Sequence, residues 1–260
     1  MKFGVCVGTD VENIRYIKEV GFDYAETNCQ QIVSKPMEHI EAMKAVGLPI
    51  LSANCFIAHR VIGKDKNEAV LKEYLATLFE RSEYLGIEYL VFGASGSRKI
   101  KEDEPMTVEE ARAQVVDFLK NLVAPVAEKH GIVVAIEPLR PAECNVINTV
   151  KDGIEIAKAV GSPYVRVLAD VAHMFAQNES LEELADMGEW LVHAHTSNPN
   201  PDPKLDIKRI YPAPGDGFDQ NSFIAPLKAA GVKQCSIEGS CVNDFRTEIK
   251  IAYDVLKELR

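Results

Sequence analysis

Short apolar runs alternate with longer amphipathic runs along the whole chain, and this alternation predicts a protein of the α/β class. The apolar runs have the length of buried strands, and they recur from one end of the chain to the other. Because they carry few charges, we expect them to lie inside a sheet that is covered on both faces. The predicted strands are residues 2–8, 24–28, 50–56, 89–93, 133–137, 165–170, 191–197 and 234–239.

The segments between these runs show the spacing of helices. Residues 67–86 carry apolar side chains three and four positions apart and end at Gly86, a helix-stop residue. Residues 107–131 begin with a threonine cap and an acidic first turn, and they end at Gly131. Other glycines stand just before predicted strands in the same way, namely Gly21, Gly47, Gly161 and Gly231.

Eight strand–helix units predict a (β/α)8 barrel, the TIM barrel, with its active site at the C-terminal ends of the strands. An open doubly wound sheet is the alternative, but its first strand should lead into a glycine-rich phosphate loop. The first strand here leads into VGTDVE, which has one glycine and no G-x-G-x-x-G pattern. Since no linker or low-complexity tract interrupts the 260 residues, we expect residues 1–260 to form a single domain.

Four consecutive predicted strands each end in a side chain that can bind a metal ion: Glu137, Asp170, His195 and Glu238. Strand alternation places Glu137 on the same face as Ala135, which we expect to face the barrel interior. A single acidic residue at a strand end is also typical of a helix cap or a solvated loop, but four on adjacent strands favour a shared site. Converging carboxylates repel one another unless a cation lies between them. Oxygen-rich ligation with one imidazole is typical of Mn²⁺, Mg²⁺ or Co²⁺.

Composition narrows the possible partners and the compartment. The net charge is −10, and the one basic cluster, residues 97–101, runs directly into acidic residues, so we expect no nucleic-acid partner. No apolar stretch is long enough for a membrane span, and the N-terminus lacks the pattern of a signal peptide. The six cysteines include no C-x-x-C pair and fit reduced thiols. We therefore expect a cytoplasmic protein without a membrane partner.

Five motifs follow one another in a specific order and spacing: VFGASGSR (91–98), IEPLRPAECNVINTV (136–150), LADVAHM (168–174), HAHTSN (193–198) and SIEG (236–239). With these motifs the chain resembles the xylose-isomerase-like TIM barrels over essentially its whole length. That superfamily includes ketose 3-epimerases of the tagatose and psicose type, hydroxypyruvate isomerase, inosose dehydratase and endonuclease IV. The three-zinc cluster of endonuclease IV needs several extra histidines, which this chain, with six in all, does not supply.

The resemblance implies a role for each strand-end residue. Glu137, Asp170, His195 and Glu238 correspond to the ligands of one divalent metal ion per chain, for which we expect Mn²⁺ first and Co²⁺ or Mg²⁺ second. Glu137 and Glu238 also correspond to the catalytic acid–base pair. In this mechanism the two glutamates exchange a proton beside a carbonyl group, and the metal stabilises the enediolate formed.

Three further residues match substrate-binding positions of the ketose epimerases. Glu143 and His173 correspond to contacts with substrate hydroxyls. Arg209 is the candidate for the substrate-binding arginine, although thirteen residues separate it from His195, more than in the epimerases. The intervening proline-rich loop, residues 197–217, departs most from the family and leaves the identity of the sugar open.

The implied function is a metal-dependent isomerase or epimerase of a ketose or related keto-sugar. Two alternatives stay open, a dehydratase or lyase acting on an inosose-type keto-polyol and a sugar-binding barrel without activity. The resemblance also implies a carbohydrate substrate and a homodimer or homotetramer.

Two other residues lie close to the predicted site. We expect His193 to support His195 from one layer deeper in the barrel. Arg98 has two open interpretations, as a contact to an anionic substrate group or as one half of a surface salt bridge.

Overall fold

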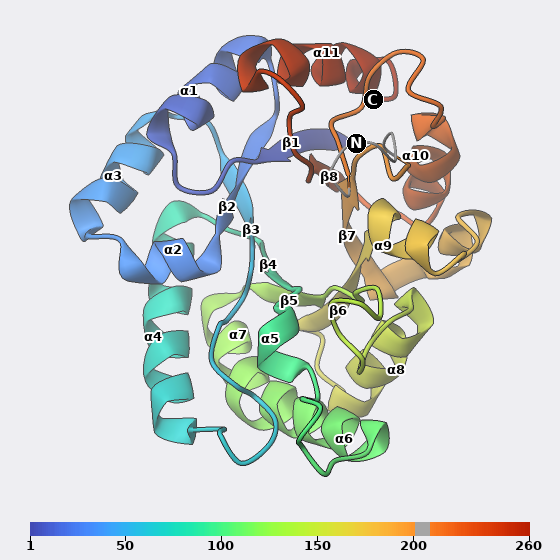
Figure 1. The fold of residues 1–260 in the computed structure, drawn as a ribbon. Coiled ribbons are helices and arrows are strands. Elements are labelled where there is room, and N and C mark those ends of the chain that lie inside the picture. Colours follow the sequence, from blue (N-terminus) through green and yellow to red (C-terminus); the bar gives the residue numbers. More distant parts are fainter. Residues whose placement is uncertain (201–208) are drawn as a thin grey trace.

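Eight parallel strands form a closed barrel in a computed structural model that describes residues 1–200 and 209–260 (Figure 1). Each strand pairs with its neighbour in the chain, and β1 pairs with β8 to close the ring, with Phe3 opposite Cys235. This topology confirms the predicted TIM barrel. The strands are β1 (Lys2–Cys6), β2 (Tyr24–Asn28), β3 (Ile50–Asn54), β4 (Tyr89–Phe92), β5 (Val133–Ile136), β6 (Val165–Asp170), β7 (Leu191–Thr196) and β8 (Gln234–Ile237).

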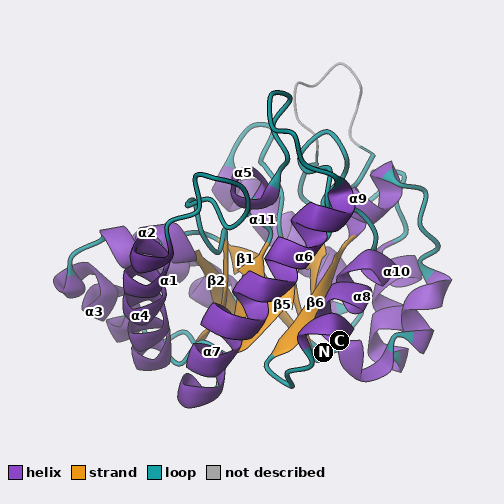
Figure 2. Ribbon diagram, turned by 90° about the horizontal axis from the view of Figure 1, so that it is seen from below, coloured by secondary structure: helices purple, strands orange, loops and turns teal. Residues whose placement is uncertain are grey.

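Helices surround the barrel, and the loops that follow the strands gather at one end of it (Figure 2). The predicted stop glycines all have positive φ angles, the conformation in which glycine ends a helix. The helices are α1 (Val11–Val20), α2 (Cys29–Ser34), α3 (Met37–Ala45), α4 (Glu68–Leu85), α5 (Ser95–Arg98), α6 (Val108–Phe118), α7 (Ala124–His130), α8 (Val150–Val160), α9 (Val171–Ala176), α10 (Gln220–Ala229) and α11 (Phe245–Lys257).

The segment predicted as one helix, residues 107–131, begins and ends as expected but is not uniform. Thr107 caps α6 and forms a capping box with Glu110. A wider π-type turn, Leu119–Val123, then separates α6 from α7. Pro125 lies in the first turn of α7 and has no N–H to donate to the preceding turn. The widened turn allows the chain to continue in helical form past this proline.

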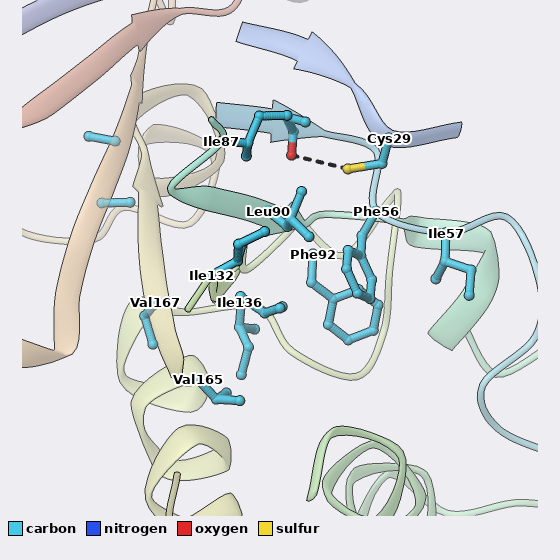
Figure 3. Packing of buried hydrophobic residues seen from close by; sticks show 14 of the residues in the cluster. Cys29, Phe56, Ile57, Ile87, Leu90, Phe92, Ile132, Ile136, Val165 and Val167 are labelled. Carbon is cyan, nitrogen blue, oxygen red and sulfur yellow. Dashed lines mark hydrogen bonds between the residues drawn. The ribbon is translucent and has the colours of Figure 1, made fainter. Parts of the chain in front are cut away.

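The two faces of the barrel strands have different environments. Outward-facing side chains such as Phe92, Ile136 and Val167 pack in the main apolar core, where Phe92 contacts Phe56 with ring centroids 5.5 Å apart (Figure 3). Inside the barrel, Val91, Ala135 and Leu168 form a small apolar cluster on the side of β4–β6. The inward face of β2, β3, β7 and β8 is instead polar, with Glu26, Ser52, His193 and Ser236 all buried.

The expectations for the cysteines, for membrane-spanning segments and for the loop 197–217 can be compared with the structure. All six cysteines are free thiols. Within the described ranges, no helix is both long enough and apolar enough to cross a bilayer. Part of the predicted loop 197–217 is described, but residues 201–208 lie outside the described residues.

Gly4 gives a test of the packing inside the barrel. The Tyr24 ring lies against Gly4, and a Cβ atom there would be 2.3 Å from Tyr24 Cε2. Gly4→Ala must therefore displace Tyr24, and we expect a loss of about 1–3 kcal/mol in the free energy of unfolding, as for other overpacked sites. Urea denaturation followed by circular dichroism measures this loss. Gly96→Ala is the control, because a Cβ there meets no atom within 4 Å; equal stability of the two variants would contradict the packing.

Candidate metal centre

The barrel brings the four predicted ligands together at the C-terminal ends of its strands. Asp170 and His195 lie in β6 and β7, while Glu137 and Glu238 directly follow β5 and β8. Each residue offers one donor atom, and these four atoms all lie within 4.8 Å of one another. Such a group of three carboxylates and one imidazole can hold a metal ion.

His195 is at the middle of this group, and its ring is completely buried. Its Nδ1 atom lies 3.1 Å from Glu238 Oε2, 3.3 Å from Glu137 Oε1 and 3.7 Å from Asp170 Oδ2. Its Nε2 atom lies 2.8 Å from Oε1 of Glu26, on the opposite side of the ring. One ring nitrogen therefore faces the candidate ligands, and the other faces a separate carboxylate.

This donor set fits a cation. A neutral imidazole with its proton on Nε2 presents a lone pair at Nδ1, and three carboxylate oxygens point their lone pairs at the same place. Burial acts to lower the pKa of His195, but the carboxylates of Glu26 and Glu238 outweigh it and raise this pKa well above its usual value. The site thus attracts positive charge strongly, and a divalent ion could bind all four donor atoms at once.

Among the described residues, the cationic side chain of Arg209 contacts this group directly. Its Nη1 donates to Asp170 Oδ2, and its Nη2 lies 2.7 Å from Glu238 Oε2. Burial acts to raise the pKa of both carboxyls, but Arg209 outweighs it and holds each pKa below its usual value. The chain brings Arg209 here because its neighbour Ile210 bridges to Asn198 and Ser240. The predicted substrate-binding arginine thus lies at the site, paired with two candidate ligands.

Above the four residues is a cavity of about 400 Å³ that is open to solvent on one side. Glu137 and Glu238 line it, and the structure places Glu143 and His173 in its wall as well. His173 Nε2 lies 3.9 Å from Glu137 Oε1, and its Nδ1 accepts from the backbone N–H of Arg140. The other lining residues are Gln30, Asn54, Cys55, Ile57, Ala58, the segment 93–97, Leu139 and Arg209.

Glu143, the first of the predicted hydroxyl contacts, is also tied to its own loop. Its Oε1 lies 2.7 Å from Arg140 Nη2 and accepts from Arg140 Nε at 2.8 Å. This ion pair holds the carboxylate in the wall of the cavity. Glu143 therefore faces the cavity, and its contact with substrate hydroxyls stays a prediction.

Two buried charged residues near the site have roles that the sequence did not predict. Arg98 is fully buried and donates to the backbone carbonyls of Phe92 and Glu137, so both interpretations given to it above are wrong. Glu26 is also fully buried and contacts both His193 and His195. A signal for Glu26 was present, because it is the only charged residue in the strand YAETN and shares its inward face with Tyr24.

With the barrel and the site described, the class of protein is a TIM barrel with a cluster of carboxylates and histidine at its C-terminal end. Residues 14–259 match the family model described as "Xylose isomerase-like TIM barrel". The chain belongs to this family, which confirms the resemblance seen in the sequence.

The named relatives share less than a third of their residues with this chain. The chain is 29% identical over 195 residues to a 3-dehydro-D-guloside 4-epimerase of Escherichia coli K12, covering 72% of this chain and 74% of that protein. The apo structure of 3-keto-D-glucoside 4-epimerase from E. coli superposes with a TM-score of 0.83 at 23% identity, covering 99% of each chain. D-psicose 3-epimerase of Clostridium cellulolyticum H10, solved with D-tagatose, gives a TM-score of 0.77 at 20% identity, covering 99% and 92%. At these identities the structures show a shared fold.

Gly93 allows the position of Glu137 to be tested. A Cβ atom on Gly93 would lie 1.7 Å from Glu137 Oε2, so Gly93→Ala must push this carboxylate out of the group. We expect the affinity for Mn²⁺, measured by calorimetry, to fall about 10-fold or more, as when a metal ligand loses its support. Gly96→Ala, three residues further on in α5, is the control and should bind Mn²⁺ as the wild type does. Unchanged affinity in Gly93→Ala would contradict ligation by Glu137.

Metal content tests the group as a whole. Protein treated with a chelator and then dialysed against Mn²⁺ should regain one ion per chain, because the four donors surround a single position. Asp170→Asn removes one charged donor and should lose the ion under the same dialysis. Glu143→Gln changes a carboxylate of the cavity wall outside the group and should retain it. Atomic absorption measures the content, and equal loss in both variants would place the ion elsewhere.

Proposed function

We propose that this protein is a divalent-metal-dependent isomerase or epimerase of a ketose or related keto-sugar. One observation carries the proposal: Glu137 and Glu238 both belong to the four-residue group and both line the cavity above it. Two carboxylates beside one cavity are what the transfer of a proton from one face of a carbon to the other requires. The names of the E. coli and Clostridium relatives, which are sugar epimerases, support this reaction class.

The two glutamates are held so that each can exchange a proton with a bound sugar. Asn54 Nδ2 donates to Glu238 Oε1 at 3.0 Å, which fixes the direction of this carboxylate. Glu137 is held through its main chain, whose N–H donates to the carbonyl of Phe92 at 3.3 Å. One glutamate removes the proton from the carbon next to the carbonyl, and the other returns a proton to the opposite face. The net result is an inverted centre with no change in composition.

Asp170 and His195, together with the two glutamates, would hold the metal ion, for which Mn²⁺ is our first candidate. When bound, the ion supplies Lewis-acid stabilisation of the negative charge that develops on the substrate's carbonyl oxygen. In the proposal Glu143 and His173 contact substrate hydroxyls, and Arg209 is the substrate-binding arginine. The single domain, the homodimer or homotetramer and the cytoplasmic location expected from the sequence stay predictions.

Exchange of substrate protons with solvent tests the reaction directly. Metal-stripped protein is incubated in D₂O with ketoses, aldoses and inosose-type ketones, with and without Mn²⁺, and followed by proton NMR. We expect Mn²⁺-dependent loss of one signal next to the carbonyl of a ketose or keto-sugar, with an epimer or isomer as product. A deoxy or unsaturated product would instead assign a dehydratase, and binding without exchange would assign a sugar-binding protein.

Variants of the two glutamates test their roles. Glu137→Gln and Glu238→Gln should each slow exchange about 10²- to 10⁴-fold, the range typical of general acid–base catalysis. Glu143→Gln is the matched control: it should raise KM while exchange at saturating sugar continues. Exchange that survives in both catalytic variants would rule out the proposed acid–base pair.

A further inference from the structure

Glu26 is a completely buried carboxylate beneath the candidate metal centre, away from the cavity. Its Oε1 accepts one hydrogen bond, from His195 Nε2 at 2.8 Å. Its Oε2 is close to three donors, namely His193 Nε2 at 2.8 Å, Ser52 Oγ at 2.7 Å and Ser236 Oγ at 2.6 Å. This arrangement is built for a charged carboxylate, because a buried acid without donors would stay neutral.

The four contacts determine where the histidine protons lie. A carboxylate can only accept, so the nitrogen that each histidine turns toward Glu26 must carry a proton. An imidazole that binds a metal ion is neutral and has one N–H, and for His195 that N–H is at Nε2. Its Nδ1 is then a lone pair, and this is the atom that faces Glu137, Asp170 and Glu238.

We propose that Glu26 is a positioning residue that holds His195 in the tautomer whose Nδ1 can bind the metal ion. The inference rests on the proposed metal centre, and it gives a function to a residue that lies outside the four-residue group and does not line the cavity. Glu26 cannot rotate away, since three donors hold its other oxygen. His193, one of the three, is itself fixed by stacking on Tyr89, with ring planes 8° apart.

The two oxygens of Glu26 have different numbers of neighbouring donors, and this difference determines how the amide of Glu26→Gln would be oriented. In Glu26→Gln one carboxylate oxygen becomes an NH₂ group, which donates. The Oε2 position has three neighbouring donors and keeps the oxygen, so the NH₂ group takes the Oε1 position and faces only His195. His195 Nε2 must then accept, and its single proton moves to Nδ1. This proton blocks the atom that the metal ion needs.

The test uses the full-length protein with ¹⁵N-labelled histidine. Zn²⁺ serves as a diamagnetic probe for NMR, and calorimetry measures the affinity for Zn²⁺ and Mn²⁺. In the wild type with Zn²⁺ bound, we expect a proton on His195 Nε2 and a metal-shifted Nδ1. In metal-free Glu26→Gln we expect no proton on Nε2, and a metal affinity lower by about 10- to 100-fold, the usual effect of losing such a partner.

Two other variants separate positioning from packing. Ser52→Ala removes one donor from Oε2 but leaves the contact with His195, so metal affinity should stay within about threefold of the wild type. Glu26→Asp retains a carboxylate and should keep the proton on His195 Nε2. Equal loss of metal affinity in Ser52→Ala and Glu26→Gln would indicate a general packing role and overturn the proposal.

The outcomes distinguish this inference from the proposed function. If the wild type binds no metal ion at the four residues, the proposed function fails. If the wild type binds metal and exchanges sugar protons, but Glu26→Gln keeps wild-type affinity or keeps the Nε2 proton, only the role of Glu26 fails. Should Glu26→Gln not fold, the wild-type Zn²⁺ spectrum still decides, because Zn²⁺ bound at Nε2 instead of Nδ1 contradicts the proposal.

Discussion

The structure at the C-terminal end of the barrel depends on how three buried carboxylates and the half-buried Glu238 are compensated around one imidazole. Burying a charge is costly unless it is paired and hydrogen-bonded. Glu26 has four neighbouring donors, whereas Glu238 accepts a hydrogen bond from Asn54 and forms an ion pair with Arg209. Arg209 offsets part of the charge of Asp170 and Glu238. Around His195 Nδ1, however, the four facing atoms of the group are all acceptors when the imidazole is neutral. A cation beside His195 Nδ1 would complete the arrangement, and the contacts of Glu26, Asn54 and Arg209 would then support its ligands.

The fold was predictable because parallel strands covered on both faces leave a simple pattern of apolar runs. All eight runs are strands, and the differences are at their ends. The predicted strands 2–8 and 50–56 stop at Cys6 and Asn54, just before Gly8 and Cys55, whose φ angles are 60° and 54°. A positive φ at Cys55 is set by its tertiary surroundings, and local sequence does not encode it. The π-type turn before Pro125 escaped prediction for a similar reason, since helical spacing continues through it.

The candidate site also contains residues that the sequence predicted and residues that only the structure revealed. Glu137, Asp170, His195 and Glu238 could be found because strand ends meet at one rim of a barrel, whatever the loops between them do. Glu26 lies within its strand, and only its three-dimensional neighbours show why a charge is tolerated there. Arg98 follows a glycine-containing loop and looks exposed in the sequence, yet its guanidinium lies between two strand-end carbonyls. The number of residues between His195 and Arg209 did not predict the position of Arg209, because the bridges made by Ile210 determine how this segment comes back to the barrel.

Asp170 shows how two competing interpretations of one residue can both hold. An acidic residue at the end of a strand is typical of a helix cap, and Asp170 does cap α9: its Oδ1 accepts from Ala172 N–H at 2.7 Å and from His173 N–H at 3.0 Å. The cap uses one carboxylate oxygen and fixes the plane of the group. The second oxygen, Oδ2, is thereby directed at Arg209 and toward His195 Nδ1. Capping and metal ligation are therefore compatible, because the helix N-terminus orients the oxygen that the metal centre would use.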